Sequence, residues 1–200
     1  MTTVSKLDLA ERPTRPERHL PGEAGTWVFI FGDMGVFAVF FCTYLYYRGE
    51  HPDLFNDSQL ALRPSYGVIN TLFLLASSLC VVLGIRAVRA ESRKVAPSLF
   101  FLALLCGLGF AVMKFVEYSE KLSAGITPVT NSFFMYYYIL TGLHFFHVVL
   151  GMAVLIFLIV KSRATILTAR QFAFMEGGAC FWHMVDLLWI VLFPLVYLVK

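Results

Sequence analysis

The stretch WVFIFGDMGVFAVFF, residues 27–41, is apolar at nearly every position and contains one acidic residue, Asp33. A helix that crosses a bilayer needs about 20 mostly apolar residues, and the surrounding block, about 25–47, is long enough. Similar blocks follow at about 66–86, 96–118, 131–160 and 177–199. The sequence therefore predicts an all-α fold, a polytopic membrane bundle of five transmembrane helices.

The overall composition agrees with a membrane protein. Of the 200 residues, 58% are hydrophobic and 14% are charged, whereas soluble domains are about half apolar and a quarter charged. Residues 1–24 contain no apolar core, which excludes a cleavable signal peptide. We expect a flexible cytoplasmic tail over 1–24 and a single membrane domain over 25–200, with His51-Pro52 and Pro64 marking a loop after the first span.

The basic residues are distributed unevenly over the connections between spans. If the spans alternate in direction, one side of the membrane receives eleven Lys and Arg residues and the other receives five, which are Arg48, Arg63, Lys114, Lys121 and Lys200. Basic residues are enriched in cytoplasmic loops. The N-terminus is therefore predicted in the cytoplasm and the C-terminus outside.

Charge and cysteine usage exclude other classes. The net charge of +3 is too small to suggest a nucleic acid partner. The cysteines, Cys42, Cys80, Cys106 and Cys180, all lie in apolar blocks and form no CxxC pair. Their spacing suggests neither a disulfide framework nor a zinc site, so we interpret them as buried thiols that pack as small apolar side chains.

Ionisable residues inside the predicted spans are the candidate functional residues. Each costs about 2.5–3.5 kcal/mol at mid-depth on insertion scales, so such groups usually face protein or water. The set comprises Asp33, Glu117, His144, His147, His183 and Asp186, and Glu176 lies at the mouth of the last span. We expect them to contact one another rather than lipid.

The spacing of these residues suggests how they meet. His144 and His147, like His183 and Asp186, are three residues apart and share a helix face. Asp33 and Asp186 lie about 12 and 13 Å from the cytoplasmic ends of their helices, which places them in one layer. Asp33 is therefore predicted to be a polar cross-link between helices, with a proton relay through the histidines as the alternative. The charges of KFVEYSEK, residues 114–121, are expected to approach the outer surface.

A metal or haem site of the chain's own is not predicted. Haem or binuclear metal sites need facing histidines, and only three histidines are embedded, two of them on one helix. A di-iron site needs Glu-x-x-His on paired helices, and neither Glu117 nor Glu176 is followed by histidine at that offset. We expect no catalytic, cofactor-binding or metal-binding residue.

Two motifs resemble a known family. TGLHFFHVVLG, residues 141–151, and FWHMVDLLWIVLFPLVY, residues 181–197, are similar to the TGxHxxHVxxG and WHxVDxxW patterns of the cytochrome c oxidase subunit 3 family, which is subunit III of the haem-copper oxidases. NTLFLLASS, residues 70–78, and Glu117-Tyr118 also fall where that family has similar residues. The resemblance covers about 25–199 and corresponds to the short, five-helix bacterial form.

The chain departs from the family pattern at two points. Asp33 stands where the family usually has an embedded glutamate, so the carboxylate is retained with a shorter reach. The two N-terminal helices of the seven-helix form are absent, so the lipid contacts that they help to form are not expected unchanged.

The resemblance implies a non-catalytic role in aerobic electron transport. Subunit III packs against catalytic subunit I, which holds the haems and copper, stabilises it and supports proton uptake. The implied location is the bacterial plasma membrane, with membrane phospholipid as a further ligand. Three alternatives stay open: a nitric oxide reductase accessory protein, suggested by HLPGEAGTWVFIFGDM (19–34), a stand-alone proton channel or transporter, and an assembly factor. Internal repeats and broken helices, which are typical of transporters, are not found in the sequence.

Overall fold

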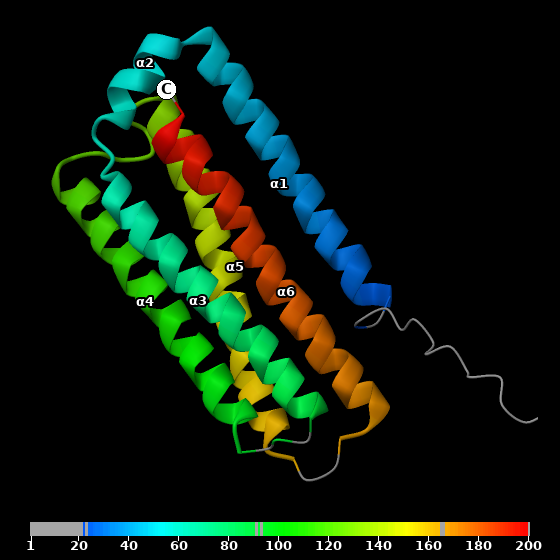
Figure 1. The fold of residues 1–200 in the computed structure, drawn as a ribbon. Helices are drawn as coiled ribbons and strands as arrows, with labels where there is room; N and C mark the ends of the chain where they lie inside the picture. The colour runs from blue at the N-terminus through cyan, green and yellow to red at the C-terminus, as the bar shows by residue number, and fades with distance from the viewer. Residues whose placement is uncertain (1–21, 23, 91, 93, 165–166, 200) are drawn as a thin grey trace, which may run out of the picture.

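The computed structural model describes residues 22, 24–90, 92, 94–164 and 167–199, so the predicted tail over 1–24 lies almost wholly outside the described residues. Within them every regular element is helical (Figure 1). The elements are α1 (Ala24–Glu50), α2 (Pro52–Gln59), α3 (Pro64–Arg89), α4 (Ala96–Ser123), α5 (Ser132–Ser162), α6 (Ala169–Phe193) and a π-helical turn (Pro194–Leu198).

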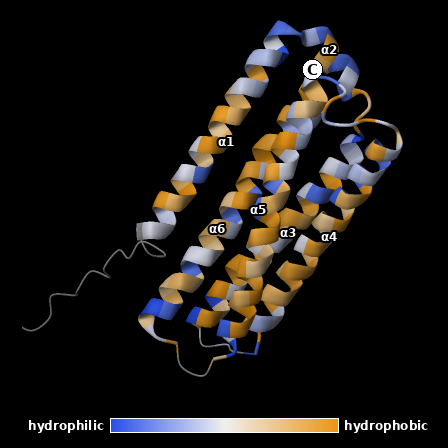
Figure 2. Ribbon diagram, turned by 180° about the vertical axis from the view of Figure 1, so that it is seen from behind, coloured by the Kyte–Doolittle hydropathy of each residue, from blue (hydrophilic) through white to orange (hydrophobic). Residues whose placement is uncertain are grey.

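Five of these helices, all except α2 and the terminal turn, are long and apolar enough to cross a membrane, which confirms the predicted fold class. They run side by side along the long axis of the molecule, and apolar residues cover most of their length (Figure 2). The helices α3, α4, α5 and α6 form the packed body. The helix α1 lies along α5 and α6 and is the least enclosed of the five.

The connection between the first two spans is partly helical, which the sequence analysis did not predict. Its prolines predict a break in the helical pattern, but Pro52 occupies the first turn of α2, where a missing N–H is tolerated. Phe55 is fully buried and anchors α2 on the bundle. The side chain of Gln59 donates a 3.0 Å hydrogen bond to the Val196 carbonyl oxygen, which ties α2 to the C-terminal turn.

The last helix begins at Ala169 rather than near 177. Thr168 caps it in a reciprocal arrangement: its hydroxyl accepts from the Gln171 N–H at 3.3 Å, and the Gln171 side chain accepts from the Thr168 N–H at 3.1 Å. This capping box satisfies two backbone donors at a helix start. Its Thr-x-x-Gln spacing is visible in the sequence.

The helix α4 ends in a Schellman motif. Gly125 follows its C-cap with φ of 76°, a left-handed conformation that glycine adopts without steric cost. The Ile126 N–H then donates to the Lys121 carbonyl oxygen at 2.9 Å, and the Gly125 N–H to that of Leu122 at 3.0 Å. The chain turns sharply here, next to the turn between α2 and α3.

Close helix packing depends on glycines in the α4–α5–α6 contact. Trp182 is fully buried and lies against Gly107 and Gly151. A Cβ atom added to Gly151 would lie 2.5 Å from the Trp182 ring, so only glycine fits. Gly151 of the TGxHxxHVxxG motif thus accommodates Trp182 of the WHxVDxxW motif.

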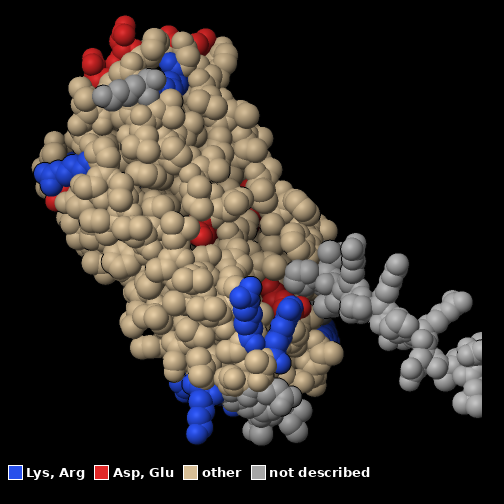
Figure 3. Space-filling view, viewed as in Figure 1, with Lys and Arg blue, Asp and Glu red and all other residues tan. Residues whose placement is uncertain are grey.

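Charged residues gather at the two ends of the bundle. Acidic residues cluster at the α2 end and basic residues dominate the opposite end (Figure 3). The exposed acids at the α2 end include Glu50, Asp53 and Asp57, and the exposed basic residues at the opposite end include Arg86, Arg89, Lys94, Arg163 and Arg170.

Candidate functional site

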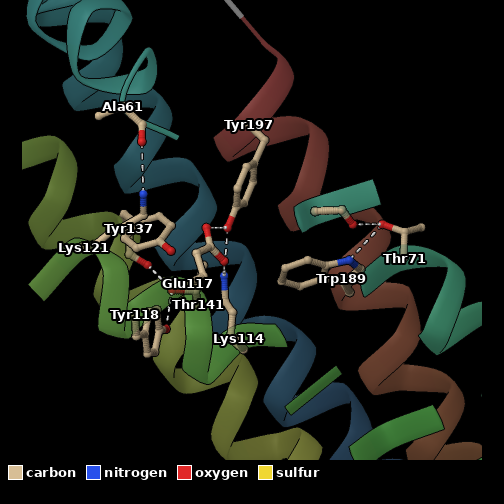
Figure 4. A network of polar contacts seen from close by, with 11 residues as sticks. Ala61, Thr71, Lys114, Glu117, Tyr118, Lys121, Tyr137, Thr141, Trp189 and Tyr197 are labelled. Atoms are coloured by element: carbon tan, nitrogen blue, oxygen red, sulfur yellow. Dashed lines mark hydrogen bonds and ion pairs between the residues drawn. The ribbon is translucent and has the colours of Figure 1, made fainter. Parts of the chain in front are cut away.

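A buried polar cluster occupies the bundle toward its α2 end, where α4, α5 and α6 meet (Figure 4). The Lys114 ammonium donates to a Glu117 carboxylate oxygen and to the Tyr197 hydroxyl, both at 2.8 Å. The Tyr197 hydroxyl in turn donates to the other Glu117 oxygen at 2.7 Å. The three side chains therefore form a closed ring of hydrogen bonds.

Aromatic rings complete the surroundings of the Lys114 ammonium. Four ring centroids lie 5.2–5.4 Å from Nζ, within the distance of favourable cation–π contact. The rings belong to Tyr118, Tyr137, Trp189 and Tyr197. A carboxylate, a hydroxyl and ring faces thus replace the hydration of this cation.

The π-helical turn positions Tyr197 in this cluster. Pro194 has no N–H and begins the turn, which closes with a 2.9 Å bond from the Val199 N–H to the Pro194 carbonyl oxygen. Such wide turns are rare and occur often at functional sites. Here the turn places the Tyr197 hydroxyl between Lys114 and Glu117.

The charged residues of 114–121 lie toward the end of α4, but the two lysines and Glu117 point into the bundle rather than to solvent. Lys114 is 0% exposed, Glu117 is 1% exposed and Lys121 is 6% exposed. All three lie on the inward face of α4, where partners on other elements bind them. The Lys-x-x-Glu spacing of Lys114 and Glu117 is a sequence signal for an ion pair along a helix, but it does not tell which way the pair faces.

Two further hydrogen bonds link motif residues across helices. The Tyr118 and Thr141 hydroxyls are 2.6 Å apart and join α4 to α5. The Trp189 indole N–H donates to the Thr71 hydroxyl at 3.0 Å and joins α6 to α3. These contacts explain why threonine and tryptophan suit these positions in the motifs.

Asp33 meets His147, as its predicted depth suggested. The His147 Nε2 atom lies 3.3 Å from an Asp33 oxygen, an ion-pair distance, although that oxygen makes no well-directed hydrogen bond. The other ring nitrogen, Nδ1, lies 2.8 Å from the Leu143 carbonyl oxygen. A carbonyl only accepts, so Nδ1 carries hydrogen, and a neutral ring would then turn a lone pair toward the carboxyl group. The contact joins α1 to α5 at this level of the bundle.

His144 has different surroundings from His147 although the two are three residues apart. It is fully buried between Phe110 and Trp189, with ring centroids at 5.6 and 5.2 Å. Neither of its ring nitrogens has a hydrogen-bond partner among the described residues. His144 thus packs as an aromatic side chain.

The polar residues of α6 contact α3 rather than the histidines of α5. The Ser78 hydroxyl lies 2.6 Å from His183 Nδ1. Glu176 forms an ion pair with Arg89 near the basic end of the bundle. Asp186 is buried, and its Oδ1 atom has no hydrogen-bond partner among the described residues. Of the acid–histidine contacts that the sequence suggested, the one between Asp33 and His147 forms.

The described residues contain no group of three or more His, Cys, Asp or Glu side chains placed to hold a metal ion. The polar groups instead join neighbouring helices, in pairs or in the small ring around Lys114. This arrangement links the helices of the bundle through side-chain contacts.

Comparison with known proteins agrees with the motifs. Residues 22–200 match the family described as Cytochrome c oxidase subunit III. A cytochrome c oxidase subunit 3 of Alkalihalophilus pseudofirmus is 31% identical over 193 residues, covering 93% of this chain and 92% of the relative. A probable quinol oxidase subunit 3 of Staphylococcus haemolyticus is 27% identical, covering 88% and 87%.

A third relative differs in its organisation. The heme-copper oxidase subunit I+III of Aeropyrum pernix is 30% identical over 182 residues, covering 86% of this chain but 22% of the relative. The similarity thus extends over a minor part of that much longer chain. The match over residues 22–200 and the similarity to the two separate subunits above establish that this chain belongs to the cytochrome c oxidase subunit III family.

Proposed function

We propose that the chain is the non-catalytic subunit III of a respiratory haem-copper oxidase, which stabilises the catalytic subunit and supports proton uptake. The observation that carries this proposal is the family match over residues 22–200. Haem and copper are assigned to the partner subunit, and membrane phospholipid is the remaining ligand that we propose for this chain.

The fused relative supports catalytic subunit I as the partner. Its printed name combines subunits I and III in one chain, so the two parts of that protein are made together and in equal number. A chain that is similar to the subunit III part alone is expected to associate with a separate subunit I.

The distribution of charge supports an N-terminus in the cytoplasm, and the bacterial relatives support insertion in the plasma membrane of a bacterial cell. Basic residues dominate the end of the bundle opposite α2 (Figure 3). Lys114 is buried and paired with Glu117, so it no longer counts toward the α2 end. When Lys114 is left out of the count, the excess of basic residues on the side predicted to be cytoplasmic becomes larger.

For Asp33 we propose a structural role, with proton exchange as the alternative. The side chain is 21% exposed and pairs with His147, which links the loosely packed α1 to α5. An imidazole and a carboxyl group can each carry a proton, which makes exchange chemically feasible. His144 packs between aromatic rings, and its ring nitrogens have no hydrogen-bond partner among the described residues, which disfavours a continuous relay from this pair toward the Lys114 cluster.

Purification of a tagged chain from its native membrane tests the proposal. We expect a haem-bearing membrane subunit to co-purify and to show the absorbance of a haem-copper oxidase, while the chain purified alone shows no haem bands. Stoichiometric haem in the isolated chain would contradict an accessory role. Nitric oxide reduction without oxygen reduction by the purified complex would favour the nitric oxide reductase alternative.

Two further experiments test the remaining alternatives, a proton channel and an assembly factor. Proton flux through vesicles that contain the chain alone, abolished by Asp33→Asn, would favour a channel. Association that occurs only during biogenesis, and is lost from the mature oxidase, would favour an assembly factor.

A further inference from the structure

A polar pocket opens at the α2 end of the bundle, beside the Lys114 cluster. Its volume is about 150 Å³, enough for several water molecules or a small polar group. The turn between α2 and α3, the start of α3 and the end of α4 form its walls, with Ala61, Arg63, Tyr66, Glu117, Glu120, Lys121, Ala124 and Ile126 as the lining residues.

Lys121 is the incompletely satisfied group in this pocket. Its side chain points toward the turn that precedes α3 (Figure 4), and Nζ donates a single 3.2 Å hydrogen bond, to the Ala61 carbonyl oxygen. The Tyr137 ring lies 5.5 Å from Nζ. An ammonium has three donors, and no carboxylate forms an ion pair with Lys121 among the described residues. A cation that is 6% exposed therefore retains unused donor capacity at the edge of a cavity.

The charges around the pocket leave one positive charge in excess. Arg63 pairs with Glu120 at 3.6 Å, and the Tyr66 hydroxyl donates to Glu120 at 2.8 Å. Glu117 is neutralised by Lys114. The surplus charge is that of Lys121, so a group with a single negative charge balances the pocket. A phosphate dianion would overcompensate it and meet the two lining carboxylates.

The lining residues also indicate whether a lipid or a protein side chain supplies the negative charge. The apolar lining residues are Ala61, Ala124 and Ile126, too few and too small to hold an acyl chain. The pocket lies at the turn between α2 and α3 and at the end of α4, where Arg63, Glu120 and Lys121 line it. A protein loop that carries a carboxylate fits this position better than a lipid does.

We propose that Lys121 and this pocket receive the carboxylate of an Asp or Glu side chain from a loop of the catalytic subunit on the α2 side of the membrane. The inference rests on the proposed function, because it takes the partner from it. A buried charge that pairs with a charge of the partner binds it tightly, and loss of one member of such a pair mainly accelerates dissociation.

Zero-length cross-linking of the purified complex tests this contact directly. A carbodiimide activates a carboxylate, and a touching lysine amine displaces the urea to form an amide without a spacer. We expect mass spectrometry to find Lys121 joined to an acidic peptide of the catalytic subunit. Lys121 joined only to Glu117 or Glu120 of its own chain, or left unmodified in the intact complex, would overturn the proposal.

Variants provide a second measurement. Lys121→Met is expected to raise the dissociation rate of the complex about tenfold or more, whereas the matched control Lys94→Met, exposed at the opposite end, should leave it unchanged. Lys121→Arg keeps the charge and should retain the partner even if Lys121→Met folds poorly. Equal dissociation rates for Lys121→Met and the wild type would refute the contact.

Two further outcomes identify other ligands and count against the proposal. A phospholipid retained by the wild type and lost from Lys121→Met would assign the pocket to a lipid headgroup. Stabilisation of the isolated chain by acetate, relative to chloride at equal ionic strength, without a cross-link to the partner, would assign it to a free carboxylate. Failure of any haem subunit to co-purify, by contrast, contradicts the proposed function itself.

Discussion

The Lys114 ammonium lies 2.8 Å from a Glu117 carboxylate oxygen inside the bundle, and neither side chain is more than 2% exposed. Both charges are removed from water, so each depends on the other and on Tyr197. Breaking such a pair by removing one member usually costs more than replacing both. The four ring faces around the ammonium add to this dependence.

The first prediction concerns this pair. Lys114→Met and Glu117→Gln should each lower the free energy of unfolding by about 3–5 kcal/mol, because the remaining group is left buried and unbalanced. The double variant should lose less than the sum of the two single losses. Unfolding in detergent, followed as a double-mutant cycle, measures the coupling, and additive losses would show that the two charges do not depend on each other.

The second prediction concerns Gly151. Gly151→Ala should destabilise the bundle by about 1–3 kcal/mol, because its Cβ would lie 2.5 Å from the ring of the immobile Trp182. Gly35→Ala is the matched control, since nothing lies within 4 Å of a Cβ there. The control should remain within about 0.5 kcal/mol of the wild type. Thermal unfolding of both variants in the same detergent decides the comparison.

The third prediction concerns Asp33. Asp33→Leu should cost about 0.6 kcal/mol, the average for polar contacts between membrane helices, and should weaken the packing of α1 rather than unfold the body. Protease sensitivity between α1 and α2 is the measurement. Asp33→Glu keeps the carboxylate opposite His147 and should behave like the wild type. Recovery of the oxidase complex should fall with Asp33→Leu, and unchanged recovery together with unchanged protease sensitivity would argue against the cross-link.

The fourth prediction concerns the start of α6. Thr168→Ala removes the hydroxyl that accepts from the Gln171 N–H, while the backbone N–H at position 168 still donates to the Gln171 side chain, and should cost about 1 kcal/mol. Thr43→Ala is the control, because that hydroxyl bonds only the Val39 carbonyl oxygen of its own helix, at 2.8 Å. Hydrogen exchange of the first turn of α6 should increase in the first variant alone. Equal exchange in both would mean that tertiary packing, not the cap, holds this turn.

The contacts of Asp33 were partly predictable. The rise per residue of a helix gives the depth of each side chain in the membrane. By this measure Asp33 lies at a depth where histidines of other spans are available as partners. The choice of His147 over His144 follows from helix rotation, which places His144 between Phe110 and Trp189. Rotation about the helix axis is set by packing with all neighbours, and no local sequence pattern specifies it.

The amino-acid sequence by itself determined the five spans, because the cost of placing polar backbone and side chains in hydrocarbon depends on composition and length. It also determined the family, through motifs whose spacing survives in the linear chain. Only the tertiary structure decided that Lys114 and Lys121 face inward, that α2 covers one end and that Tyr197 reaches Glu117 across 80 positions of sequence. Those facts arise from side chains that satisfy one another's charges across separate helices, and such pairing exists only once the helices have packed.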